Sequence, residues 1–239
     1  MIAWPLASRV PGPRGCDPSV RALPSESPSD GELSVAESSD ILSRISQSAS
    51  LEEHLQSQHS HIVTVFGSSR VSEGHSEYVA AQDLGRQIAQ RGWTLCNGGN
   101  EGTMEATARG AKAAGGKTIG VTLERYRAAP SNSWLDQEIV ADTLLARLEH
   151  LTSLGEAYVV LRGGIGTLLE LSLVWNLLQS AVPHPRPVIV VGKAWATVLT
   201  TIGEALPMHK WEPGSLTLVD SIDQAIQRLD IHFRLSANS

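Results

Sequence analysis

A glycine-rich turn followed by a glutamate is the stretch of this sequence best suited to chemistry. Residues 159–161 are apolar and mostly β-branched, residues 163–166 contain three glycines, and an apolar helical pattern follows Thr167. This strand–turn–helix order places open backbone N–H groups and the positive end of the helix dipole at the turn, which favours a bound anion. Glu170 comes one turn into the predicted helix, so its carboxylate stays near the same opening. The pattern indicates a site for a nucleotide or sugar phosphate.

Two further strand–turn junctions come earlier in the chain. Residues 93–97 are predicted to form a strand, and the glycine-rich residues 98–106 lead from it into a helix. Residues 62–66 form a strongly predicted strand that runs into Ser68 and Ser69. In a doubly wound sheet the loops at the carboxyl ends of the strands line the ligand crevice. Both serines are therefore candidate donors to a phosphate or ribose, with a turn or helix cap as the alternative interpretation.

These turns together resemble the LOG (Lonely Guy) family, long mislabelled lysine decarboxylases. Residues 163–170 resemble the family signature PGGxGTxxE, and residues 98–106 resemble its GGGxxGxMxA loop. LOG proteins are Rossmann-like nucleoside monophosphate phosphoribohydrolases, best known for releasing free cytokinin bases. The sequence departs from the family pattern at Arg162, which replaces the proline, and at Asn100, which replaces the third glycine. Glu101 also places an acid in the second loop, where it repels a phosphate unless it points away.

The resemblance implies a catalytic pair formed by Arg147 and Glu170. Family members carry an Arg-Lys pair at the first position, and here the arginine is kept while the next residue is Leu148. In N-glycosidic cleavage a carboxylate stabilises the oxocarbenium-like sugar and orients the attacking water. By resemblance Glu170 takes that role, and Arg147 polarises the base or fixes the phosphate. No cofactor and no metal is implied.

A substrate- and phosphate-binding set also follows from the resemblance. The backbone N–H groups of the turn at residues 163–166, with the hydroxyl of Thr167, are expected to hold the 5′-phosphate and so position the reacting bond. The implied binding residues are Gly67, Ser68, Ser69, Gly98, Gly99, Gly102, Met104, Gly163, Gly164, Ile165, Gly166 and Thr167.

The order of elements predicts an α/β fold, a doubly wound (Rossmann-like) parallel sheet with helices on both faces. The predicted strands cover residues 62–66, 93–97, 117–122, 159–161, 187–191 and 216–219. Apolar helical stripes lie at residues 78–89, 108–114, 143–154, 168–178, 195–206 and 222–229.

Two regions of this predicted domain receive a more specific interpretation. The helix at residues 143–154 is expected to present Leu144, Leu148 and Leu151 to the core. Residues 123–142 are predicted to be irregular and polar. In LOG-like proteins this segment lies over the substrate, so it is expected to carry base selectivity.

The chain is predicted to divide into a tail, residues 1–58, and a Rossmann-like nucleotide-binding domain, residues 59–239. Residues 1–40 are rich in Pro, Ser and Gly, which favours disorder, and short helical pieces are predicted at 41–45 and 51–55. Three arginines in the tail permit a transit-segment interpretation, and a wrongly assigned start codon is the alternative.

Composition restricts the class of protein. The net charge of −6 argues against a nucleic-acid surface, and no apolar run approaches the roughly 20 residues that span a bilayer. Only two cysteines occur, Cys16 and Cys96, which favours a reducing, cytoplasmic location. The eight histidines show no metal-binding spacing.

A homodimer is expected, because the helix after Thr167 is apolar on more than one face and family members pair through this region. The residues that make it so are Leu168, Leu169, Leu171, Leu173, Val174, Trp175, Leu177 and Leu178.

Two other functions remain open. Molybdenum-cofactor carrier proteins share this fold and similar glycine loops without hydrolysing a nucleotide, and an inactive nucleotide-sensing module is the third interpretation. The departures at Arg162, Asn100 and Leu148 leave room for such binders. A decarboxylase is set aside, because it would need a cofactor-binding lysine and neither glycine loop contains one.

Overall fold

One sheet of seven parallel strands organises the described part of the chain. The computed structural model describes residue 50 and residues 60–124, 131–179, 186–207 and 216–236. All described residues lie in the unit formed by residues 45–239. The predictions for the tail, including the helical pieces at 41–45 and 51–55, lie outside the described residues.

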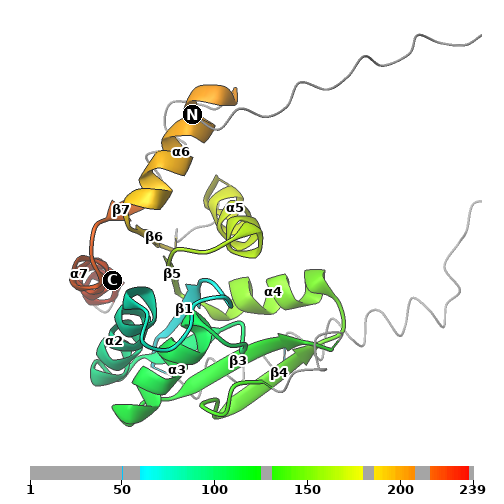
Figure 1. Cartoon of the computed structure of the whole chain (residues 1–239), viewed down its shortest axis with the longest axis vertical. Coiled ribbons are helices and arrows are strands. Elements are labelled where there is room, and N and C mark those ends of the chain that lie inside the picture. The colour runs from blue at the N-terminus through cyan, green and yellow to red at the C-terminus, as the bar shows by residue number, and fades with distance from the viewer. Residues whose placement is uncertain (1–49, 51–59, 125–130, 180–185, 208–215, 237–239) are drawn as a thin grey trace, which may run out of the picture. The chain divides into compact units, whose positions relative to one another are not determined.

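The strand order is β4-β3-β2-β1-β5-β6-β7, and every neighbouring pair is parallel (Figure 1). The strands are β1 Ile62–Phe66, β2 Thr94–Asn97, β3 Thr118–Leu123, β4 Gln137–Ala141, β5 Ala157–Val160, β6 Val188–Val191 and β7 Thr217–Val219. The first four strands extend the sheet in one direction and the last three in the other, so the order reverses between β1 and β5. Ligands of doubly wound sheets bind at such a switch point, outside the carboxyl ends of the strands.

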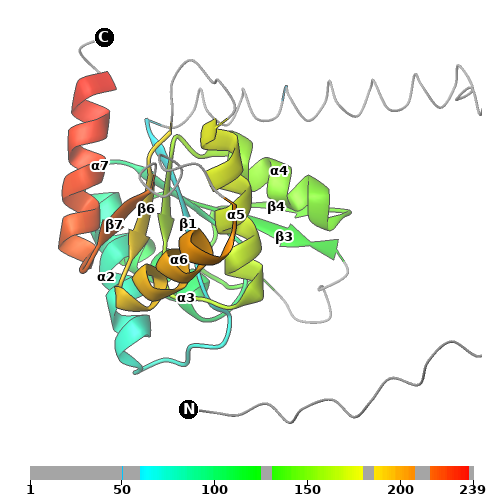
Figure 2. The ribbon, with the colours of Figure 1, turned by 90° about the horizontal axis from the view of Figure 1, so that it is seen from above.

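Helices cover both faces of the sheet, which confirms the predicted fold class. They are α2 Ser76–Gln90, α3 Thr103–Ala113, α4 Leu144–Leu154, α5 Ile165–Gln179, α6 Lys193–Ala205 and α7 Ile222–Ser236. One hydrophobic cluster joins α2, α3 and α7 to the sheet, and a second joins α4, α5 and α6 to the opposite face (Figures 1 and 2). Strand β1 serves both, with Val63 and Val65 in the first cluster and Ile62 and Phe66 in the second. The two faces of a strand alternate in this way because its side-chain period is two.

The predicted apolar stripes match the observed helices closely. Helix α2 buries the six residues predicted for it, Tyr78, Ala81, Leu84, Gly85, Ile88 and Ala89. His75 caps this helix, because its Nδ1 accepts a hydrogen bond of 3.2 Å from the N–H of Glu77. Thr143 caps α4 in the same way through Ala146. Helix α5 starts at Ile165, three residues before the predicted apolar stripe at residues 168–178.

Two predictions about the region after β3 are wrong. Residues 137–141 were expected to be irregular but form the edge strand β4, which pairs with β3 along its whole length. This strand is largely half-exposed and begins Gln-Glu, so its sequence lacks the apolar run of a central strand. Leu144, expected in the core face of α4, is 41% exposed, because the buried face starts at Arg147 and continues through Leu148, Leu151 and Leu154.

Candidate active site

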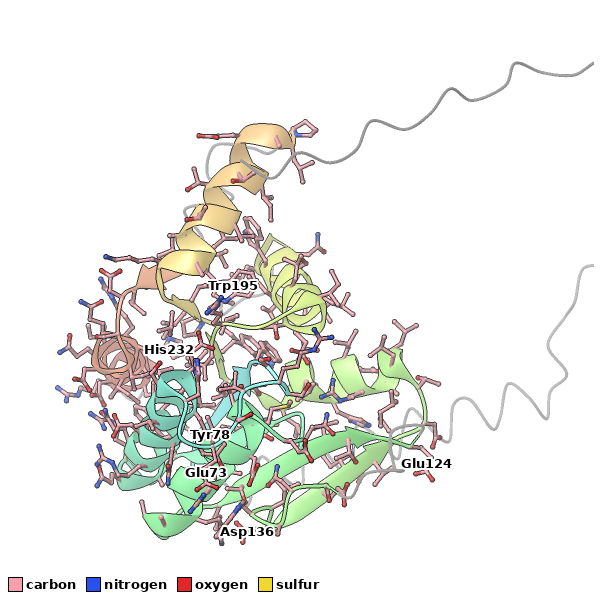
Figure 3. All side chains as sticks on the ribbon, viewed as in Figure 1. Glu73, Tyr78, Glu124, Asp136, Trp195 and His232 are labelled. Atoms are coloured by element: carbon pink, nitrogen blue, oxygen red, sulfur yellow. The ribbon has the colours of Figure 1, made fainter. Side chains whose placement is uncertain are left out.

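Three loops meet at the carboxyl ends of β1, β2 and β5. The carbonyl of Ser68 accepts hydrogen bonds from the N–H and the hydroxyl of Thr103, at 2.9 and 3.2 Å. The Thr167 hydroxyl donates to the carbonyl of Gly67 at 2.9 Å, although these residues are 100 positions apart. Trp195, labelled at the start of α6 in Figure 3, donates from its indole Nε1 to the carbonyl of Leu161 at 2.9 Å. The Thr103 bonds hold the second loop, and the Thr167 bond holds the turn at residues 163–166, against the first loop.

The second glycine loop requires glycine at two close approaches. Gly102 has φ of 73°, and a Cβ there would collide with the backbone of Ser68 and Ser69. A Cβ on Gly98 would collide with the guanidinium of Arg147. The loop therefore lets an arginine from α4 come directly against its backbone.

Asn97 organises this second loop from the end of β2, a role that the sequence analysis missed. Its side chain is fully buried and makes three hydrogen bonds. The amide Nδ2 donates to the carbonyl of Met104 at 2.9 Å and to the Thr107 hydroxyl at 3.1 Å, while Oδ1 accepts from the N–H of Gly99 at 2.8 Å. The available signal is a polar residue that ends a buried strand directly before a glycine loop.

Replacing Asn97 with alanine is expected to destabilise the fold by roughly 1–3 kcal/mol, because buried partners lose their hydrogen bonds. Urea denaturation measures the change, and Asn176→Ala on the exposed side of α5 is the control. Equal stability of the two variants would show that Asn97 does not hold the loop.

Arg147 is buried at the centre of the site, with 8% of its surface exposed. Its Nε donates to the carbonyl of Val121 at 2.8 Å, and its two terminal nitrogens lie 3.3 Å from the carbonyl of Gly98 and 3.3 Å from Oε1 of Glu170. The guanidinium thus links Gly98, directly after β2, and Val121 of β3 to helix α5. The pair implied by the resemblance is brought into direct contact.

Glu170 is equally buried, and burial raises its pKa to about 7, although the neighbouring Arg147 acts to lower it. A carboxyl group with this pKa exchanges a proton readily near neutral pH, which suits general acid or base work. The pair therefore combines a fixed positive charge with a proton-exchanging carboxyl group at the edge of the sheet.

The other predicted binding residues divide by accessibility. Gly98, Gly99, Gly102, Met104 and Thr167 are buried, Gly67, Ser68 and Gly163 are half-buried, and Ser69, Gly164, Ile165 and Gly166 are exposed. The first backbone bond of α5 runs from the N–H of Leu168 to the carbonyl of Gly164 at 2.9 Å. The N–H groups of Ile165, Gly166 and Thr167 precede that bond, so they have no partner within the helix.

Two cavities open beside the glycine turn at residues 163–166. The first, which we call the α2 cavity, has a volume of about 440 Å³. Its lining includes Arg70, His75, Glu77, Arg162, Gly163 and Gly164. A second cavity of about 430 Å³ lies beside the starts of α6 and α7 and shares Glu77 and Arg162 with the first. The α2 cavity lies against the turn that is predicted to bind phosphate.

The three departures from the family pattern have distinct surroundings. Leu148 is buried with 5% exposure, so it belongs to the core face of α4. The carbonyl of Asn100 accepts a hydrogen bond of 3.1 Å from the Asn132 side chain, and Glu101 beside it is exposed. Arg162 donates from a terminal nitrogen to Oε1 of Glu77 at 2.7 Å and remains largely exposed.

Within the described residues, no group of three or more His, Cys, Asp or Glu side chains is arranged to hold a metal ion. None of the described helices is both long and apolar enough to cross a membrane.

Known proteins with related sequences and structures were compared with this chain. A cytokinin riboside 5′-monophosphate phosphoribohydrolase from Mycobacterium tuberculosis is 33% identical over 168 residues, 65% of this chain and 87% of that protein. A pyrimidine/purine nucleotide 5′-monophosphate nucleosidase from Escherichia coli is 27% identical over 147 residues, 55% of this chain and 31% of that protein. The molybdenum cofactor carrier protein from Chlamydomonas reinhardtii has a similar structure, with a TM-score of 0.58 and 25% identity over 74% of this chain and 99% of that one.

The model of the SLOG cluster4 family matches residues 60–210, which include all three loops, Arg147 and Glu170. This match covers more than half of the chain and agrees with the phosphoribohydrolase relatives, so the resemblance to the LOG family is confirmed. The chain belongs to the SLOG cluster4 family.

Proposed function

We propose that the protein is a nucleoside 5′-monophosphate phosphoribohydrolase, which uses water to cleave the N-glycosidic bond and yields a free base and ribose 5-phosphate. The observation that carries this proposal is the buried contact between Arg147 and Glu170, 3.3 Å long, which joins α4 and α5 beside the glycine loop that follows β2. Relatives named for this class of reaction support it.

The pair suits the charge that develops during glycosidic cleavage. The sugar becomes oxocarbenium-like, and a carboxylate beside it stabilises that positive charge and orients the water. Glu170 can supply the carboxylate, since its pKa of about 7 leaves a substantial ionised fraction at neutral pH. Arg147 stabilises that ionised form and contributes a fixed positive charge for the base or the phosphate.

The N–H groups at the start of α5 that have no partner within the helix are proposed to hold the 5′-phosphate. Gly163 and Gly164 let the phosphate come close to the backbone of the turn. The Thr167 hydroxyl is engaged with the carbonyl of Gly67, so we assign it to joining the two loops. The phosphate then anchors the nucleotide at a distance from the bond that breaks.

A molybdenum-cofactor carrier is the second candidate, favoured by the structural likeness to the Chlamydomonas carrier. A carrier breaks no bond and has no need of a carboxyl group with a pKa near neutrality beside a buried arginine. The Arg147–Glu170 pair therefore favours the hydrolase.

One assay separates the two functions. The purified full chain is incubated with a panel of purine and pyrimidine nucleoside 5′-monophosphates, and released ribose 5-phosphate is measured. The hydrolase releases it from at least one nucleotide. No release from any nucleotide, with a pterin found by native mass spectrometry of the fresh protein, would establish the carrier instead.

We further propose that the protein is a homodimer that works in the cytoplasm. Figures 1 and 2 place α4 beside α5 on one face of the sheet, and these helices expose Leu145 (78%), Ile165 (82%) and Leu169 (42%). Exposed apolar side chains gathered on neighbouring helices are typical of protein–protein interfaces. The buried free thiol of Cys96 supports a reducing compartment.

Light scattering at micromolar concentration is expected to report twice the chain mass of 25.6 kDa. Leu145→Glu should reduce this to the monomer mass, because a charge enters the apolar contact. Ile231→Glu is the matched control, since Ile231 is exposed on α7 at the opposite face of the sheet. A monomer for the wild type, or equal effects of both substitutions, would contradict an interface at α4 and α5.

A further inference from the structure

The crossover from β3 to β4, which the structure describes over residues 131–136, packs against the second glycine loop. Leu135 lies against the backbone of Gly120 in β3, where a Cβ would collide with the leucine side chain. The end of the crossover is fixed to the start of β3, because the N–H of Thr118 donates to the carboxylate of Asp136 (Figure 3) at 2.9 Å. This segment is therefore a fixed neighbour of the loop.

Asn132 joins this crossover to the second glycine loop by two hydrogen bonds. Its backbone N–H donates to the carbonyl of Gly99 at 3.0 Å, and its side-chain Nδ2 donates to the carbonyl of Asn100 at 3.1 Å. The other end of the same side chain, Oδ1, accepts from the N–H of Trp134 at 3.2 Å, which fixes the direction of the amide. One residue thus binds two successive carbonyls of the loop.

The carbonyl that precedes these two, that of Gly98, accepts a hydrogen bond from Arg147. The distance to the terminal nitrogen of the guanidinium is 3.3 Å. The approach leaves no room for a side chain, since a Cβ on Gly98 would collide with the guanidinium. Any displacement of the loop therefore moves the surface against which the Arg147 guanidinium lies.

Asn132 shares the anchoring of the loop with Asn97. The Asn97 side chain accepts from the N–H of Gly99 at 2.8 Å and so fixes the peptide between Gly98 and Gly99. The two Asn132 bonds fix the next two peptides. The loop needs such anchors, because Gly98, Gly99 and Gly102 leave its backbone a wide choice of conformations.

We propose that Asn132 is a positioning residue for the Arg147–Glu170 pair, because it fixes the glycine loop against which the Arg147 guanidinium lies. This inference rests on the proposed function and adds a residue to the same site. Asn132 acts through the loop and Arg147, and it neither binds the nucleotide nor transfers a proton.

Two variants of Asn132 in the full chain test the role. Asn132→Ala should lower kcat for ribose 5-phosphate release by roughly three- to tenfold, the net effect of one lost hydrogen bond. KM should change little, because the Arg147–Glu170 pair acts in the transition state. Asn132→Asp keeps the acceptor for Trp134 and loses the donor to Asn100, so it should lower kcat at least as far. Wild-type kcat in Asn132→Asp would overturn the proposal.

The Arg147→Met background shows whether Asn132 acts through the arginine. Without the guanidinium the loop has nothing to position, so Asn132→Ala should cause no further fall in kcat. An equal fall in both backgrounds would overturn the proposal, since independent effects multiply. Ser133→Ala is the matched control, because Ser133 is exposed in the same segment. Thermal unfolding shows that each variant is folded, and Asn132→Asp carries the test if the alanine variant unfolds.

Hydrogen exchange at Arg147, measured by NMR, needs no turnover and so separates this proposal from the proposed function. The Nε–H of Arg147 is buried and donates to the carbonyl of Val121, and its signal is assigned by its absence from Arg147→Met. Its exchange with water should be roughly three- to tenfold faster in Asn132→Ala than in the wild type, and unchanged in Ser133→Ala.

Faster exchange in Asn132→Ala, without release of ribose 5-phosphate from any nucleotide by the wild type, would contradict the hydrolase and support the positioning of Arg147 by Asn132. Unchanged exchange would overturn the role of Asn132, whether or not the protein is a hydrolase.

Discussion

Glu170→Gln is expected to lower kcat for ribose 5-phosphate release by about 100- to 1000-fold, the usual effect of removing one preorganised electrostatic contact. Glutamine keeps the shape of the side chain and its hydrogen bonding but removes the negative charge that faces the oxocarbenium-like sugar. Nucleotide affinity should change far less, since this interaction acts in the transition state and the phosphate-binding turn is intact.

Steady-state kinetics and calorimetric binding on the wild type and the variant measure both effects. Glu149→Gln is the matched control, because Glu149 is an exposed glutamate on α4. Wild-type turnover by Glu170→Gln would exclude Glu170 from catalysis.

The free energy of unfolding of Glu170→Gln shows whether its lower kcat comes from the missing charge or from a damaged fold. Burial raises the Glu170 pKa from 4.5 to about 7, so between these values the native state holds a proton that the unfolded chain has lost. The native wild type therefore loses stability as the pH rises through this window, and the loss is complete above pH 7. Glutamine does not ionise, so Glu170→Gln should be more stable than the wild type at pH 8, by a margin on the order of 3 kcal/mol. At pH 4.5 the difference should be small, and urea denaturation at both values tests the sign.

The fold could be predicted because its strands and helices carry strong local signals. Residues Ile62–Phe66 are apolar apart from one threonine and fully buried, and the stripe of α2 has the period of a helix with one covered face. Strand β4 lacked such a signal. Its ladder to β3 supplies backbone hydrogen bonds, whatever its side chains, and no local pattern encodes that pairing.

The site residues also differ in whether a local sequence pattern predicts them. The glycine turns and Glu170 are local motifs, and the resemblance supplied Arg147. The contacts that hold the loops together join distant positions, such as Thr167 with Gly67 and Arg162 with Glu77. Such contacts follow from the order of strands in the sheet, so they became visible only in the folded structure. The role of Asn97 depends on a loop geometry that the sequence does not specify.

Arg147→Met is expected to lower kcat at pH 7 by at least about 100-fold and to move the acidic limb of the pH profile upward. Charge attraction and a hydrogen bond from Arg147 both act to lower the Glu170 pKa, against the larger effect of burial. Without the guanidinium, burial acts alone and the Glu170 pKa rises above its value of about 7. If the ionised carboxylate is the active form, a smaller fraction of the enzyme is then active at neutral pH.

The pH profile distinguishes this electrostatic role from simple damage to the site. Arg147 also holds the carbonyls of Gly98 and Val121, so a general collapse would lower kcat at every pH without moving the limb. Arg147→Lys keeps the charge but not the planar three-way contact. It should retain most of the pH profile while losing turnover. Circular dichroism first establishes that each variant is folded, and kcat is then measured from pH 5 to 9. An unshifted acidic limb in Arg147→Met would show that this arginine does not control the ionisation of Glu170.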